Sequence, residues 1–132
     1  MKKKIVFIMM LFMALTGSYT SETNAASNPE KERPTFLKNP RDEIVLEGFN
    51  VKITAVVTGK PFPSVHFYRD KEIIKNDARH VITTNSDTGE VTLTILNTKL
   101  KDDGKYTISA QNDAGRTTAS CQLIVLEFDD GL

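Results

Sequence analysis

The sequence predicts an all-β fold, a sandwich of seven to eight short strands in two sheets with Greek-key connections. Several runs of the chain alternate strictly between apolar and polar residues, and no convincing helical period appears. Turn residues separate these runs at intervals of about 8–12 positions, which is the spacing of sandwich strands. Strict alternation means that one side of each strand faces a core and the other faces water.

Four runs carry this pattern: VKITAVV at 51–57, VTLTIL at 91–96, YTISA at 106–110 and ASCQLIVL at 119–126. Glycine and prolines in TGKPFPS, at 58–64, end the first run and force an extended connection. NSDTGE at 85–90 and NDAGR at 112–116 supply the Asn, Asp and Gly that tight turns need. Helical structure is expected to be a single turn at most, within NTKLKDD at 97–103.

The N-terminal segment differs in character from the rest of the chain. Three lysines precede eleven apolar residues, Ile5–Leu15, and a polar stretch with small residues follows. This order predicts a signal peptide over residues 1–26, and the apolar run is too short to span a bilayer. Residues 27–34 are expected to form a flexible linker, residues 35–127 the folded domain, and residues 128–132 an acidic tail without a membrane anchor.

The composition excludes several classes of function. Lys+Arg and Asp+Glu are both 17, so no basic surplus exists to attract nucleic acid. Cys121 is the single cysteine, which rules out an intrachain disulfide and a zinc site built on several thiolates. His66 and His80 are too isolated to predict a metal centre. No catalytic motif or phosphate-binding glycine loop is present, so the chain is expected to be a non-enzymatic protein without cofactor or metal.

Several motifs at fixed spacing give the fold a family resemblance. They are RPTFLKNPRDEIVLEGFNVKI, VTGKPFPSVHFYRDKEI and LTILNTKLKDDGKYTISAQNDAG, the last containing Asp-x-Gly-x-Tyr over Asp102–Tyr106. Together they resemble the intermediate-set immunoglobulin domains of the titin, twitchin and myosin-light-chain-kinase group. The resemblance covers roughly Arg33 to Glu127, nearly the whole predicted domain.

The chain departs from this family at its disulfide. Ala55 and Ile108 occupy the positions of the two family cysteines, and Phe67 replaces the family tryptophan. A small residue beside a large one can fill similar volume by apolar packing. The predicted core therefore centres on Ala55, Phe67 and Ile108, with Leu93 and Tyr106 also facing inward, and Cys121 is expected to be a buried thiol.

The resemblance also implies two structural contacts. The hydroxyl of Tyr106 is expected to bond to the backbone a few residues upstream, as in a tyrosine corner. Arg79 and Asp102 occupy positions that form an ion pair at the bottom of similar sandwiches. Both contacts are expected to stabilise the fold, with no direct role in binding.

Candidate partner contacts lie in the loops at one end of the predicted sandwich. Phe62 stands between two prolines, and it is expected either to be an exposed contact or to fold back over the end of the core. Asn112, Asp113 and Arg116 belong to the second loop at that end. Strand edges offer a further surface. The partner is expected to be a protein of unknown identity, bound by a monomer.

Two functional hypotheses remain open on the sequence. The first is a secreted module that presents loops and strand edges to a protein partner, as the N-terminal segment favours. The second is a cytoplasmic domain of the sarcomere or cytoskeleton that binds myosin- or actin-associated assemblies, as the resemblance implies. The missing cysteines favour the second, because a reducing cytosol removes the benefit of a disulfide.

Overall fold

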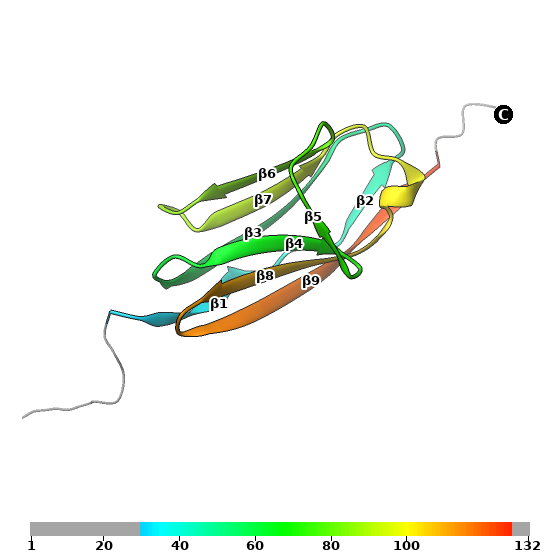
Figure 1. The fold of residues 1–132 in the computed structure, drawn as a ribbon. Coiled ribbons are helices and arrows are strands. Elements are labelled where there is room, and N and C mark those ends of the chain that lie inside the picture. The colour runs from blue at the N-terminus through cyan, green and yellow to red at the C-terminus, as the bar shows by residue number, and fades with distance from the viewer. Residues whose placement is uncertain (1–29, 128–132) are drawn as a thin grey trace, which may run out of the picture. The chain divides into compact units, whose positions relative to one another are not determined.

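The computed structural model describes residues 30–127 (Figure 1). The chain divides into two units, Met1–Glu32 and Arg33–Leu132, and the fold belongs to the second. The predictions for residues 1–26 and 128–132 lie outside the described residues. The strands are β1 (Glu32–Lys38), β2 (Glu43–Leu46), β3 (Val51–Lys60), β4 (Ser64–Arg69), β5 (Glu72–Ile74), β6 (His80–Asn85), β7 (Glu90–Ile95), β8 (Gly104–Asn112) and β9 (Gly115–Leu126).

The strands form a sandwich of two sheets (Figure 1). One sheet has the order β1-β3-β7-β6, and the other has the order β2-β9-β8-β4-β5. All registered pairs are antiparallel except β2 and β9, which run parallel with Glu43 opposite Leu123. The predicted all-β, disulfide-free sandwich is confirmed, with nine strands in residues 30–127 in place of the expected seven or eight.

The two unexpected features are at the start of the sandwich. The chain leaves the first sheet at Lys38 and crosses to the second, so the first stretch of the domain yields two strands, β1 and β2. β1 begins at Glu32, three residues before the expected domain start at Thr35. Pro34 fits this strand because β1 is at the edge of its sheet, where a missing backbone donor costs no ladder bond.

The core lies between the two sheets and follows the alternation of the strands. In β3 every second residue is buried, beginning at Val51, while Lys52 on the opposite side is exposed. The four runs recognised in the sequence supply most of the core. Its buried members are Val51, Ile53, Ala55, Val57, Phe67, Val91, Leu93, Ile95, Tyr106, Ile108, Ala110, Cys121, Leu123 and Val125.

Within residues 30–127, helical structure is limited to one 3₁₀ turn, Leu100–Asp102, inside the segment where a single turn was expected. This turn leads into β8 and brings Asp102 into a buried position. Across residues 30–127, no helix is both long and apolar enough to traverse a bilayer.

Candidate functional site: the loop end of the sandwich and its supports

The residues at the two family cysteine positions are fully buried. Ala55 in β3 and Ile108 in β8 have no solvent exposure and belong to the same cluster of buried side chains. Phe67 in β4 is opposite Ile108 in the β4–β8 register and is equally buried, as is Leu93 in β7. Apolar packing takes the place of the disulfide between the two sheets. This packing stabilises the sandwich that carries the loops.

Tyr106 stabilises the end of the sandwich at which β8 begins. Its hydroxyl donates a hydrogen bond of 2.6 Å to the carbonyl oxygen of Asp102, and the whole side chain is buried. Burial raises the pKa of the Tyr106 phenol well above its usual value, and the nearby Asp102 carboxylate adds to this shift. The phenol therefore acts as a neutral donor, which is the role of a tyrosine corner.

Arg79 and Asp102 form a bidentate ion pair close to Tyr106. Nη1 of Arg79 lies 2.8 Å from Oδ2 of Asp102, and Nη2 lies 3.1 Å from Oδ1. Oδ2 also accepts a bond of 2.7 Å from the backbone N–H of Lys99. Burial by itself would raise the pKa of Asp102, but the bonds from Arg79 and Lys99 outweigh burial and lower that pKa. The pair joins the β5–β6 connection to the entry of β8.

A third support, Asp77 with His80, was missed in the sequence. Oδ1 of Asp77 accepts bonds of 2.8 Å from the backbone N–H groups of Arg79 and His80, and it lies 2.9 Å from Nδ1 of His80. The bond from the His80 side chain is the main cause that lowers the pKa of Asp77 to about 2. The sequence NDARH at 76–80 could have predicted this contact, because an Asp side chain in a turn often accepts hydrogen bonds from nearby backbone N–H groups.

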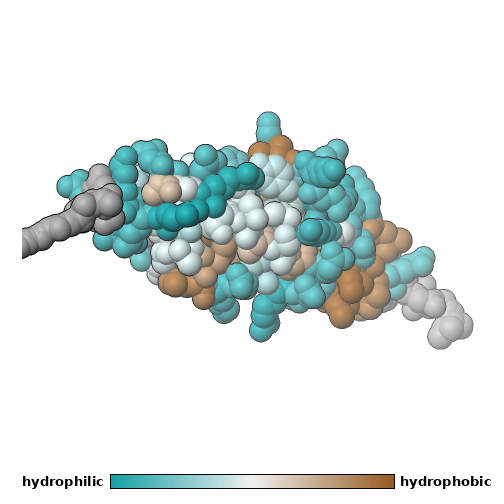
Figure 2. All heavy atoms as spheres, turned by 90° about the horizontal axis from the view of Figure 1, so that it is seen from below, coloured by the Kyte–Doolittle hydropathy of each residue, from teal (hydrophilic) through white to brown (hydrophobic). Residues whose placement is uncertain are grey.

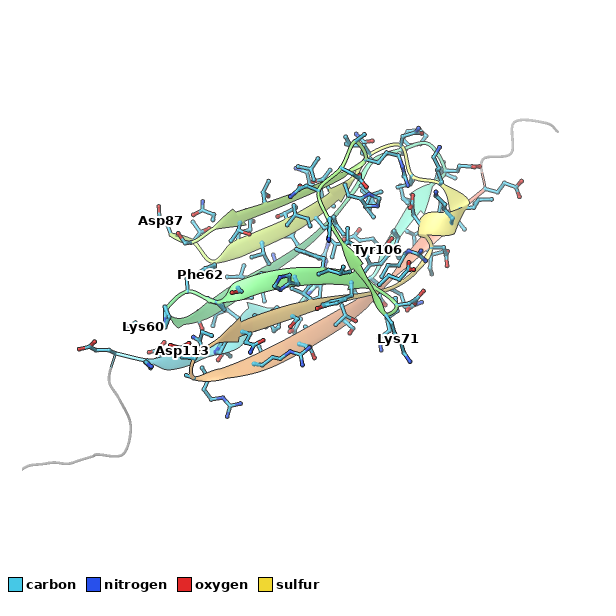
Figure 3. All side chains as sticks on the ribbon, viewed as in Figure 1. Lys60, Phe62, Lys71, Asp87, Tyr106 and Asp113 are labelled. Carbon is cyan, nitrogen blue, oxygen red and sulfur yellow. The ribbon has the colours of Figure 1, made fainter. Side chains whose placement is uncertain are left out.

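The loops at the opposite end form the candidate interaction surface. Figure 3 shows Lys60, Phe62, Asp87 and Asp113 together at this end, the first at the end of β3 and the others on three different connections. Asn112 ties two of these connections to each other. Its Nδ2 donates a bond of 2.9 Å to the carbonyl of Pro61, and its Oδ1 accepts a bond of 2.9 Å from the N–H of Ala114. Asn112 therefore orders the loop end.

The other three residues predicted to contact a partner differ in exposure: one packs against the core and two lie on the surface. Phe62 is half-buried and packs against the core, which favours the covering role over a fully exposed contact. Asp113 and Arg116 are exposed. Nε of Arg116 donates a bond of 3.2 Å to Oγ of Ser109, so the guanidinium is held over β8. A fixed charge of this kind suits recognition of another protein.

The groups that most often carry chemistry are dispersed or buried. No group of three or more His, Cys, Asp and Glu side chains within the described part of the chain has the arrangement of a metal site. Burial raises the pKa of the Cys121 thiol to about 11, with smaller contributions from Asp42 and Glu43. A thiol with so high a pKa is a weak nucleophile at neutral pH.

Comparisons with known proteins agree with this architecture. A profile of the immunoglobulin I-set domain matches residues 34–125. Human myotilin is 32% identical over 109 residues, which are 83% of this chain and 22% of myotilin. The muscle M-line assembly protein unc-89 of Caenorhabditis elegans is 31% identical over 112 residues, 85% of this chain and 1% of that protein. The chain thus spans about a fifth or less of these relatives.

Solved structures of titin immunoglobulin domains also match this chain. A crystal structure of the complex of titin M10 with obscurin-like 1 Ig matches with a TM-score of 0.70 and 28% identity, over 74% of this chain and 97% of the matched chain. The resemblance inferred from the Asp-x-Gly-x-Tyr segment and its neighbours is therefore confirmed. With the profile spanning nearly all of the sandwich, this chain belongs to the immunoglobulin I-set domain family.

Proposed function

We propose that this domain is a non-enzymatic module that binds another protein within a muscle or cytoskeletal assembly. The observation that carries the proposal is its relationship to myotilin, to unc-89 and to the titin homolog of Caenorhabditis elegans. One of these relatives is described as an M-line assembly protein, and a titin domain of the same fold was solved in complex with obscurin-like 1. This relationship favours the cytoplasmic hypothesis over the secreted one.

The proposed mechanism is the display of ordered loops on a rigid body. Asn112 holds the β3–β4 and β8–β9 connections together, so little loop freedom is left to be lost when a partner binds. Lys60, Asp113 and Arg116 are exposed at this end and supply charges of both signs. Such charges select a partner of complementary pattern more than they raise its affinity.

A second candidate is the same binding module exported from the cell. The specific observation in its favour is the sequence order of Lys2–Lys4 followed by Ile5–Leu15, which is typical of a signal peptide. In that case the loop end would meet an extracellular protein. The sandwich fold is compatible with both candidates, and the missing family cysteines favour the cytoplasmic one.

One experiment tests both candidates. The full chain with a C-terminal epitope tag is expressed in cultured muscle cells, and the medium, soluble cytoplasm and myofibril pellet are compared. The chain is expected in the pellet with residues 1–26 still attached, as measured by intact mass. An Asp113→Lys, Arg116→Glu double variant is expected to lose most of this retention. A Lys71→Glu, Glu72→Lys double variant, at the turn before β5 and the first residue of that strand, keeps the same charge balance and serves as the control.

Each outcome decides between the candidates. Chain recovered from the medium and lacking residues 1–26 would replace the first candidate with the second. Chain found in the soluble fraction alone would contradict both. Equal retention of the two double variants would remove the loop end as the binding surface.

A further inference from the structure

A groove of about 500 Å³ lies on the side of the sandwich, away from the loop contacts described above. It forms where the chain switches sheets. β1 ends at Lys38, the chain crosses past the buried Pro40, and β2 begins at Glu43 in the other sheet. Residues at the beginnings of β2 and β3 line the groove, among them Ile44 of β2 and Lys52 of β3.

The groove is lined by more positive than negative charge. Lys38, Arg41 and Lys52 are all exposed, whereas Glu43 is the single acidic lining residue and is half-buried. Three cations against one anion give a formal charge of +2. Within residues 30–127, the side chains of Lys38, Arg41 and Lys52 form no ion pair and no hydrogen bond, so these charges are available to an external anion.

A second concave site of about 230 Å³ has a smaller excess of positive charge. Its lining holds four Lys and Arg residues against three acids, a formal charge of +1, and Arg69, Arg79 and His80 are each close to an acid of the same domain. Arg79, for example, lies 2.8 Å from Asp102. Charges that are already matched offer little attraction to a ligand, so the groove at Lys38 is the stronger candidate of the two.

Apolar side chains continue from the groove onto the outer face of the second sheet. Ile44 lines the groove and is 66% exposed, and it is paired in register with the exposed Ile124 of β9. Leu46 and Leu126 form the next pair along the same two strands and are also exposed. Figure 2 shows hydrophobic residues in several patches on the face that it views, one of them at the end of the domain on the right of the picture. A ligand in the groove would therefore meet cations and an apolar border together.

We propose that this groove binds an extended acidic segment of a partner protein, with carboxylates at Lys38, Arg41 and Lys52 and apolar side chains against Ile44. An extended chain alternates its side chains between two sides, so acidic residues at every second position can face the cations while the intervening apolar ones face the border. The proposal rests on the proposed function, because it supplies the chemistry of one partner segment.

The test uses fluorescence anisotropy with the full chain and a labelled octapeptide of alternating Glu and Val. Saturable binding is expected at low salt and is expected to weaken strongly at about 0.5 M salt, where exposed charges are screened. The same peptide with Gln in place of Glu is expected not to bind. Inorganic phosphate at millimolar concentration is expected to compete poorly, because it makes no apolar contact with Ile44.

Matched variants locate the site. The Lys38→Gln, Lys52→Gln double variant removes two groove charges and is expected to weaken peptide binding about three- to tenfold. The Lys71→Gln, Lys75→Gln double variant removes two charges elsewhere on the domain and is expected to leave affinity within about twofold. All four lysines are exposed, so both variants keep the fold, which a thermal melt checks.

Three results would overturn the proposal: no saturable binding, equal weakening by the two double variants, or displacement of the peptide by phosphate at equal concentration. Any of these leaves the proposed function intact if the tagged chain still enters the myofibril pellet. Conversely, loss of that retention with peptide binding unchanged contradicts the muscle assembly role and leaves the groove in place.

Discussion

Single residues at the base of the sandwich combine packing with hydrogen bonding. Tyr106 fills core volume with its ring and satisfies the Asp102 carbonyl with its hydroxyl. Ile108, two residues later on the same strand, contributes packing alone and stands at a family cysteine position. Substitutions at these two positions therefore measure separately how much a buried hydrogen bond and how much buried apolar volume contribute to the free energy of unfolding.

Tyr106→Phe is expected to lower the free energy of unfolding by about 1–3 kcal/mol, because a buried carbonyl loses its donor. Denaturant unfolding measures this loss. Tyr68→Phe is the matched control, since Tyr68 lies partly exposed in β4, and it is expected to change stability by less than about 0.5 kcal/mol. Equal effects of the two substitutions would contradict the role of the Tyr106 hydroxyl.

Ile108→Ala is expected to cost about 2–5 kcal/mol, because it opens a cavity beside Phe67 in a fully buried site. Ile124→Ala removes the same atoms from a side chain that is 40% exposed, and it is expected to cost less than about 1 kcal/mol. Calorimetric melting of both variants gives the comparison. A loss below about half a kilocalorie for Ile108→Ala would contradict the packed core at the family cysteine positions.

At the scale of elements, the turns between strands decide how the sheets close. Gly89, in the β6–β7 turn, has a φ of 82°, and a Cβ placed there would collide with the carbonyl oxygen of Val57. Gly48, in the β2–β3 turn, has a φ of 93° but no atom within 4 Å of the same position. Both glycines adopt left-handed backbone, and only Gly89 is also packed against a neighbouring strand.

Gly89→Ala is expected to destabilise the fold by about 2–4 kcal/mol, as the sum of left-handed strain and collision with the β3 backbone. Gly48→Ala carries the strain alone and is expected to cost about 1–2 kcal/mol. Chemical denaturation of the two variants measures the difference. A Gly48→Ala variant as unstable as Gly89→Ala would show that the collision contributes nothing.

Elements with a clear local pattern were predictable, and short or uniformly apolar ones were not. β3, β7, β8 and β9 alternate over six or more residues, so their strands and inward faces followed from the sequence. β2 reads EIVL, in which apolar residues stand on both faces and hide the alternation. β5 has three residues, too few for any period.

The contact surfaces depend on neighbours that the sequence does not bring together. The groove joins Lys38 and Arg41 to Lys52 through the switch of the chain between sheets, and no local motif marks that switch. The bond from Asn112 to Pro61 likewise spans two loops that are 51 residues apart. The family resemblance implied the ion pair of Arg79 and Asp102 from their positions in similar domains, whereas it implied no shared role for the charges that line the groove.

At the scale of the whole molecule, the Arg79–Asp102 pair links stability to pH. The pKa of Asp102 is lower in the folded chain than in the unfolded chain, where it is about 3.9. The carboxylate therefore stabilises the fold above that value, and the contribution is lost as the pH falls from about 4 through the folded pKa. Asp77, whose pKa is about 2, acts in the same direction.

Asp102→Asn is expected to lower the free energy of unfolding at pH 7 by about 1–3 kcal/mol, because Arg79 loses its charged acceptor. The loss of stability on acidification from pH 4 to pH 2.5 is expected to be smaller in this variant than in the parent. Urea unfolding at several pH values measures both quantities. An identical pH profile for variant and parent would exclude Asp102 as a source of the acid sensitivity.

The parallel pairing of β2 with β9 also sets the order in which the domain folds. Glu43 and its partner Leu123 are 123 − 43 = 80 residues apart, so the second sheet gains its edge strand only when the last strand exists. Pairings this distant in sequence slow folding. At ribosomal rates of about 5–20 residues per second, β2 emerges roughly 4–16 seconds before its partner. During that interval Val45 has no β9 beside it, and the sandwich closes only after synthesis of its C-terminal strand.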